Sequence, residues 1–196
     1  MSIRRAQVLD AAVRVLGGQG TRALTHRAVD AEGGLPAGTT SNYFRSRDAL
    51  LAGILGYLFE RETAAFETLA GQPRPVSVDE LAERFGAMLR QLAGPARLLT
   101  LARHAIFLEA AHRPELRTDL LAWSEKLWGW AGDWLAAVGS DRPLTHARQL
   151  LAFGDGLLLD RLARGGDDEF APEEALAALL RAWVERGQYV EGSVDN

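Results

Sequence analysis

The chain has 196 residues, 47% of them hydrophobic and 24% charged, proportions typical of a folded globular protein. It has no cysteine, which excludes disulfides, thiol redox chemistry and cysteine metal sites, and no stretch reaches the roughly 18 uncharged apolar residues of a membrane helix. The net charge of −4 argues at first against a nucleic-acid partner, and the absence of a signal-peptide pattern leads us to expect a cytoplasmic protein without membrane contact.

The charge is unevenly distributed along the chain. Residues 1–50 contain seven arginines and four acidic residues, a net charge of +3, and the remaining residues carry −7. A basic end on an acidic body is expected when that end binds a polyanion. The chain contains a single lysine, so its general use of arginine contributes to this count, and charge alone leaves ordinary fluctuation as an equal alternative.

Apolar residues recur at helical spacing along nearly the whole chain, without an alternating strand pattern or a hairpin signal. We therefore expect an all-α protein of about nine helices. The expected helices cover approximately residues 3–17, 26–32, 37–43, 47–70, 78–93, 95–112, 114–138, 146–164 and 172–190.

Polar caps and prolines set the expected helix starts. The expected N-terminal caps are Thr25, Ser46, Ser77 and Thr145. Glu80 is placed to complete a capping box with Ser77, and Pro95 and Pro114 are expected at the first positions of the helices that they open.

Two short helices, about 26–32 and 37–43, are joined by a glycine-containing turn and predict a helix-turn-helix unit. The second is small and polar on one side, which suits insertion into a major groove where side chains contact base edges. The free N–H groups at the start of the first suit a phosphate. The residues alone leave the alternative that both helices are ordinary core. The predicted DNA contacts are Thr25, His26, Arg27, Ala37, Gly38, Thr39, Asn42, Tyr43 and Arg47.

This region resembles the DNA-binding domain of the TetR family of bacterial transcriptional regulators. The resemblance covers about the first 55 residues and is carried by Thr25, Val29, Gly34, Leu35, Gly38, Thr39, Tyr43, Phe44, Ser46, Arg47, Asp48 and Leu50. It implies a DNA-binding domain over residues 1–46 and a ligand-binding and dimerisation domain over 47–196. Within the first domain it implies phosphate contacts from Thr25, Tyr43 and Arg47, and core positions at Leu35 and Phe44.

Three residues depart from the family pattern. Ser41 stands where the family often has a phosphate-binding tyrosine, and Thr40 stands where an inward leucine is usual. Pro36 replaces the usual Ser or Asn cap of the recognition helix, so that helix must be held in another way. These departures keep a second interpretation open, an all-α ligand-binding or interaction protein with weakened or lost DNA binding.

The resemblance implies a homodimer whose last two helices pair into a four-helix bundle. Apolar stripes in both helices support this, with a purely intramolecular core as the alternative. The predicted interface residues are Leu150, Gly154, Leu157, Leu158, Leu176, Leu180 and Trp183.

A small-molecule effector is expected among the helices between about 78 and 160. Aromatic residues gather there, and they either line an apolar pocket or simply fill the core. The predicted lining is Phe85, Met88, Thr100, Arg103, His104, Phe107, Trp123, Trp130 and Phe153. We expect a medium-sized hydrophobic or aromatic effector.

No motif indicates an enzyme. The four histidines lack the spacing of a metal site, and neither a phosphate loop nor a nucleophile elbow is present. We expect no catalytic residue, no metal and no cofactor. The sequence therefore predicts a ligand-responsive transcriptional regulator, most simply a repressor on a pseudo-palindromic double-stranded DNA operator.

Overall fold

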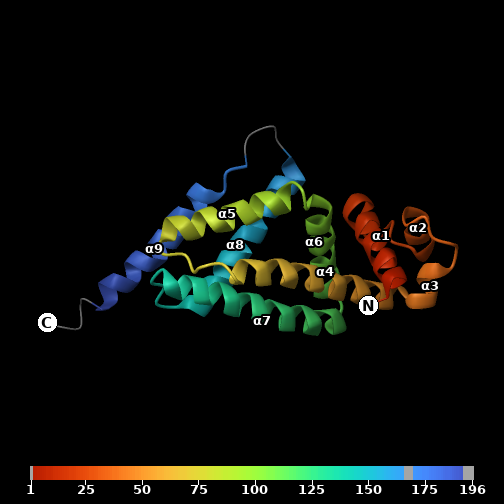
Figure 1. Ribbon diagram of the computed structural model, residues 1–196, viewed down its shortest axis with the longest axis horizontal. Coiled ribbons are helices and arrows are strands. Elements are labelled where there is room, and N and C mark those ends of the chain that lie inside the picture. Colours follow the sequence, from red (N-terminus) through yellow and green to blue (C-terminus); the bar gives the residue numbers. More distant parts are fainter. Residues whose placement is uncertain (1, 166–169, 192–196) are drawn as a thin grey trace. The chain divides into compact units, whose positions relative to one another are not determined.

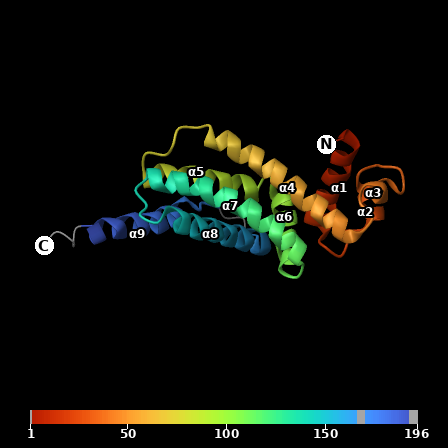
Figure 2. The ribbon, with the colours of Figure 1, turned by 90° about the horizontal axis from the view of Figure 1, so that it is seen from below.

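The structure, a computed structural model, describes residues 2–165 and 170–191, with the side chains of all of these except 69–70 and 186–191. This part of the chain forms helices and no strand, so the all-α prediction is confirmed (Figures 1 and 2). The nine helices are α1 (Ile3–Gln19), α2 (His26–Glu32), α3 (Thr39–Tyr43), α4 (Arg47–Ala70), α5 (Val78–Ala93), α6 (Arg97–Ala111), α7 (Pro114–Ala137), α8 (Pro143–Arg164) and α9 (Glu173–Glu191).

Local capping explains the starts that were predicted correctly. The hydroxyls of Thr25, Ser46 and Ser77 accept hydrogen bonds from the backbone N–H groups three residues later, at 3.0–3.1 Å. The Glu80 carboxylate reaches back to the N–H of Val76, at 2.8 Å, one residue before the expected partner. Pro114 opens α7, as predicted.

Three predicted starts differ from the observed ones by two or three residues. α8 begins at Pro143 and not after a Thr145 cap, because proline fits the first helical turn, where its missing N–H has no partner to lose. α6 begins at Arg97, after Ala96, whose carbonyl accepts from the N–H of Thr100. α3 begins at Thr39, because Gly38 has a φ of 88°, which is left-handed and outside the helix.

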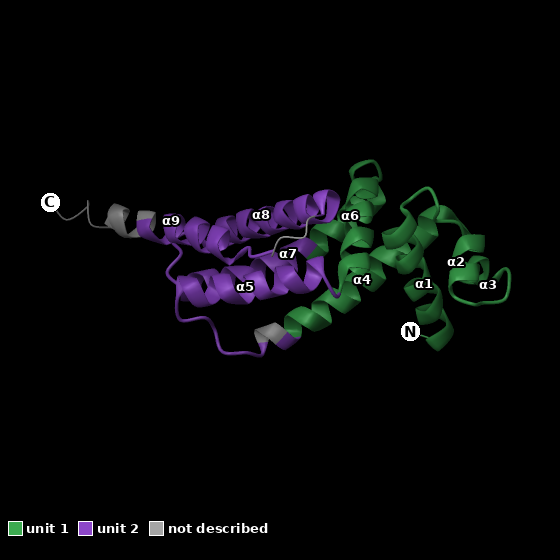
Figure 3. Ribbon diagram, turned by 90° about the horizontal axis from the view of Figure 1, so that it is seen from above, with its two compact units in different colours: residues 1–67, 96–123 green, residues 68–95, 124–196 purple. Residues whose placement is uncertain are grey.

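The described chain divides into two compact units (Figure 3). Unit 1 comprises residues 1–67 and 96–123, and unit 2 comprises residues 68–95 and 124–196. Each unit has its own hydrophobic core. The predicted boundary after residue 46 concerns function and stays a prediction.

In unit 1, α1 packs closely against α6 and also against α2. A Cβ atom added at Gly17 of α1 would lie 2.0 Å from the carbonyl oxygen of Leu98 in α6, so only glycine permits this approach. The Tyr57 hydroxyl donates to Asp10 at 2.5 Å, and Arg61 lies 3.2 Å from the same carboxylate, which links α1 to α4. Burial and this hydrogen bond raise the pKa of Tyr57.

In unit 2, α5 packs against α9 and α8. A Cβ added at Gly154 would lie 3.0 Å from the ring of Phe85, so this face of α8 meets α5 of the same chain. An apolar stripe does not reveal whether its partner is internal, so the predicted dimer interface stays a prediction. The predicted interface residues that are buried in this core are Leu150, Gly154, Leu158, Leu176 and Leu180. Leu157 and Trp183 are half-buried.

No helix within the described residues is both long enough and apolar enough to cross a membrane.

Candidate nucleic-acid interface

The recognition helix α3 presents a small, polar and exposed surface. It packs on α2, which begins at the Thr25 cap (Figure 1). The exposed predicted DNA contacts are Thr25, Arg27, Ala37, Gly38, Asn42 and Tyr43. Thr39 is half-buried, and its hydroxyl donates to the Pro36 carbonyl at 2.6 Å. With five residues, α3 is too short to fix its own orientation, so neighbouring elements must do so.

A carboxylate from α2 holds the start of α3. Asp30 is only 5% exposed, and its Oδ2 accepts from the Gly38 N–H at 2.8 Å. Its Oδ1 accepts from the Thr40 N–H at 2.8 Å and from the Thr40 hydroxyl at 2.6 Å. Asp30 therefore caps α3 from a neighbouring helix, in place of the side-chain cap that Pro36 cannot supply.

The Asp30 carboxylate remains charged despite its burial. Burial raises its pKa, but the hydrogen bonds from the hydroxyl and N–H of Thr40 and from the N–H of Gly38 together lower the pKa below its usual value. Thr40 is fully buried at the position where the family usually has an inward leucine. Its hydroxyl donates to this carboxylate. Two features of the sequence indicate an acceptor such as Asp30: Thr40 stands at a position that usually faces inward, and Pro36 leaves the recognition helix without a side-chain cap.

A histidine holds the end of α3. The Nε2–H of His26 donates to the carbonyl of Phe44 at 2.6 Å, and the Phe44 side chain is buried. A Cβ at Gly53 of α4 would lie 2.3 Å from the Phe44 ring, so the glycine lets α4 pack closely on it. His26, a predicted DNA contact, thus lies in a position that orients the recognition helix.

Arg47, predicted to contact phosphate, is bonded within the chain. Its Nη1 donates to the Leu24 carbonyl at 2.6 Å, and its Nη2 donates to the Thr21 carbonyl at 2.7 Å. The same Nη2 lies 3.9 Å from Oε1 of Glu109 in α6. The guanidinium bridges the loop between α1 and α2, because the first residue of α4 starts beside that loop. Arg45, which was not among the predicted contacts, is exposed just after α3.

Unit 1 holds five of the predicted effector-binding residues, and three of them form one cluster. Arg103 lies 5.6 Å above the Phe107 ring, and that ring meets Trp123 edge-on at 6.5 Å. Two residues that were not predicted join them: Phe59 stacks on Trp123 at 4.4 Å, and Glu62 lies 3.7 Å from Arg103.

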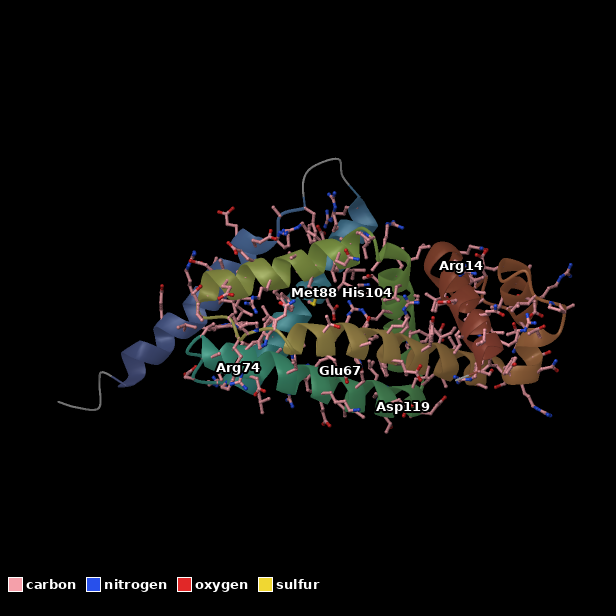
Figure 4. The ribbon with its side chains drawn as sticks, viewed as in Figure 1. Arg14, Glu67, Arg74, Met88, His104 and Asp119 are labelled. Carbon is pink, nitrogen blue, oxygen red and sulfur yellow. The ribbon has the colours of Figure 1, made fainter. Side chains whose placement is uncertain are left out.

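The other two predicted residues of unit 1 lie on α6. Thr100 is fully buried, and its hydroxyl donates to the Ala96 carbonyl at 3.2 Å. His104 is half-buried on the same helix (Figure 4).

Unit 2 holds the other four predicted effector-binding residues. Phe85 is buried, with Gly154 against its ring. Trp130 packs on Trp134, with ring centroids 4.5 Å apart. Met88 and Phe153 are partly buried against the unit 2 core, with Met88 on α5 (Figure 4). All four pack in or against the hydrophobic core of unit 2, and their role in binding an effector stays a prediction.

Two family models match the chain. "Bacterial regulatory proteins, tetR family" matches residues 8–54, and "Tetracyclin repressor-like, C-terminal domain" matches residues 76–186. The chain belongs to the TetR family. It is therefore a ligand-responsive, DNA-binding transcriptional regulator, and the resemblance found in the first 55 residues extends over most of the chain. No curated protein matches the chain.

Solved structures of TetR-like proteins cover nearly the whole chain. A TetR family member from Streptomyces coelicolor A3 is 32% identical over 93% of this chain and 99% of its own, with a TM-score of 0.68. The multidrug binding protein EbrR in complex with malachite green is 33% identical over 93% of this chain and 99% of its own, with a TM-score of 0.64. EbrR in complex with ethidium is 28% identical over 92% and 98%, with a TM-score of 0.68.

Proposed function

We propose that this TetR-family protein is a homodimeric repressor that leaves a pseudo-palindromic operator when an aromatic effector binds. The observation that carries the DNA-binding part is the recognition helix held at both ends, by Asp30 at its start and His26 at its end. A five-residue helix fixed in this way is pre-organised for a groove. This supports retained DNA binding over the interpretation that the departures at Pro36 and Thr40 have abolished it.

The proposed contacts follow from exposure and chemistry. The proposed phosphate contacts are Thr25, Arg27, Tyr43 and Arg45, which are exposed. His26 and Arg47 are the proposed positioning residues, because both bond to backbone carbonyls. The proposed base contacts are Ala37, Gly38, Thr39 and Asn42. We expect no catalytic activity, and we expect the protein to act where its operator is, in the cytoplasm.

Operator selection tests the DNA-binding proposal. Full-length protein is used to select duplexes from a random pool, and the selected sites are expected to contain two inverted half-sites about one helical turn or more apart. Asn42→Ala should weaken the selected site by about 1–3 kcal/mol and relax the sequence preference at one position. Gln72→Ala, an exposed amide in the linker before α5, is the matched control. A wild-type protein that selects no sequence would refute the proposal.

Unit 1 suggests the chemistry of the effector. EbrR binds ethidium, proflavin and malachite green, which are aromatic cations. In this chain, Phe59, Phe107 and Trp123 form one group of rings. The carboxylate of Glu62 on α4 lies 3.7 Å from Arg103, whose guanidinium covers the Phe107 ring. Aromatic rings and a buried carboxylate both attract an aromatic cation. We therefore propose an aromatic cation as the effector.

The effector test starts without DNA, because such dyes also bind duplexes directly. Malachite green is titrated into the protein and into Trp123→Leu, with binding followed by calorimetry. We expect binding to the wild type and a clear loss in the variant. The control is Trp128→Leu, which changes a half-buried tryptophan of unit 2 that lies under Arg148. Dye that then releases the operator from the wild type, but not from Trp123→Leu, supports the switch. Equal binding to all three proteins would exclude this cluster.

The dimer is proposed to form through the outward face of α8. Ala152, Gly156 and Leu159 are exposed on it, and a Cβ added at Gly156 would meet nothing within 4 Å. Small residues beside an exposed leucine permit close helix packing. Sedimentation of the full-length protein should give a dimer, and a monomer at micromolar concentration would contradict the proposal.

A further inference from the structure

The guanidinium of Arg47 joins two carbonyls that directly precede α2. Its hydrogen bonds to Thr21 and Leu24, at 2.7 and 2.6 Å, span the loop between α1 and α2. Leu24 is the residue before Thr25, the cap of α2, and its side chain is buried. Arg47 and these two carbonyls, here called the Arg47 clamp, therefore fix where the first turn of α2 lies.

A chain of alternating charges connects the Arg47 clamp to the end of α6. Glu109 of α6 lies 3.9 Å from Arg47 and 3.0 Å from Arg113, and Arg113 lies 3.2 Å from Asp48. Residues 47 and 48 begin α4, whereas residues 109 and 113 belong to the end of α6 and the turn that follows it. All four side chains lie in unit 1.

We propose that Glu109 is a positioning residue for DNA binding: it orients the Arg47 clamp and thereby places the first turn of α2 for a phosphate. The inference rests on the proposed operator binding. The clamp requires the planar guanidinium, because two different nitrogens of Arg47 donate to the two carbonyls. A lysine ammonium has one nitrogen and cannot reproduce this geometry. Glu109 reaches Arg47 from α6, so a displacement of α6 changes the clamp.

Two substitutions separate this role from a direct phosphate contact. Arg47→Lys retains the charge, so a phosphate contact at this position predicts nearly wild-type operator affinity, whereas the clamp predicts a loss of about tenfold. Glu109→Gln removes a negative charge, which by general electrostatics strengthens DNA binding, whereas the positioning role predicts that it weakens binding about fivefold. The opposite signs make the second test decisive.

The matched control is Glu115→Gln, which removes an exposed charge elsewhere in unit 1. Affinities for the selected operator and for a scrambled duplex are measured with all variants. Positioning lowers the ratio of specific to non-specific affinity, leaves the salt slope unchanged and makes the two losses non-additive in the double variant. The inference would be overturned if Arg47→Lys bound the operator with wild-type affinity. It would also be overturned if Glu109→Gln bound more strongly than the wild type, to the same extent as Glu115→Gln.

Amide hydrogen exchange gives a second readout without DNA. Arg47→Lys and Glu109→Gln should both speed exchange in residues 21–29, and Glu115→Gln should not. If the wild type binds no duplex, the proposed operator binding fails, and exchange alone then decides on the clamp. Unchanged exchange in either test variant rejects the positioning role.

Discussion

Replacing Asp30 by asparagine tests how the recognition helix is held. The wild-type carboxylate accepts three hydrogen bonds, from the N–H of Gly38 at 2.8 Å and from the N–H and hydroxyl of Thr40 at 2.8 and 2.6 Å. An asparagine amide keeps one accepting oxygen and places an NH₂ group where the second oxygen accepted a bond. At least one buried donor then loses its partner, and the remaining bonds lose their ionic character.

The expected cost follows from these bonds. A hydrogen bond to a charged group contributes about 1.5–3 kcal/mol, and an unsatisfied buried donor costs about 1–3 kcal/mol. We therefore expect Asp30→Asn to lower the free energy of unfolding at pH 7 by about 2–4 kcal/mol. Since the hydrogen bonds hold the Asp30 pKa below 3.8, this contribution is present above that pH and disappears as pH falls through the folded-state pKa.

Urea unfolding of the full-length protein, followed by circular dichroism, measures the cost. Asp119→Asn is the matched control, because Asp119 is an exposed carboxylate of the same unit (Figure 4). Its effect should stay within about 0.5 kcal/mol. Operator affinity should fall in Asp30→Asn under conditions where the protein remains folded. Equal stability of the two variants at pH 7 would refute the capping role of Asp30.

Three further predictions concern the rest of the fold. In urea unfolding, Gly17→Ala should destabilise the protein by about 1–3 kcal/mol, because its Cβ would overlap a carbonyl of α6. Gly18→Ala should instead stabilise the protein by up to about 1 kcal/mol, because its Cβ has space. Gly156→Arg should dissociate the dimer in sedimentation, and Gly129→Arg, an equally open helical glycine, should leave it intact. Burial lowers the pKa of His146; the charge of Asp141 raises it and the charge of Arg142 lowers it further. The free energy of unfolding of the wild type should therefore increase as pH rises toward 6.5. His146→Phe should lose this pH dependence.

The sequence was sufficient wherever a helix is determined by neighbouring residues. α2, α4 and α5 begin and end at the predicted residues because caps such as Thr25 and Ser77 act within one turn. The start of α8 differs from the predicted one because two local signals, Pro143 and Thr145, competed and the proline prevailed. The presence of each helix and most helix boundaries could therefore be predicted from the sequence alone.

Contacts between residues that are far apart in the sequence were harder to predict. The bond from His26 to Phe44 spans 18 residues and the bonds from Arg47 to the α1–α2 loop span 23 and 26, distances over which periodicity carries no information. The apolar stripe of α8 was recognised, but its partner at Gly154 is α5 of the same chain. A stripe gives the direction of burial and does not give the surface that covers it.

The structure shows that the arginines behind the net charge of residues 1–50 lie in different environments. Of the seven arginines in residues 1–50, Arg14 pairs with Glu32 at 2.8 Å and Arg47 is bonded to loop carbonyls. Exposed arginines beside the recognition helix, Arg27 and Arg45, supply charge that a phosphate can meet. The net charge of +3 therefore includes two kinds of arginine: Arg14 and Arg47, which bond within the chain, and the exposed Arg27 and Arg45, which are the proposed phosphate contacts.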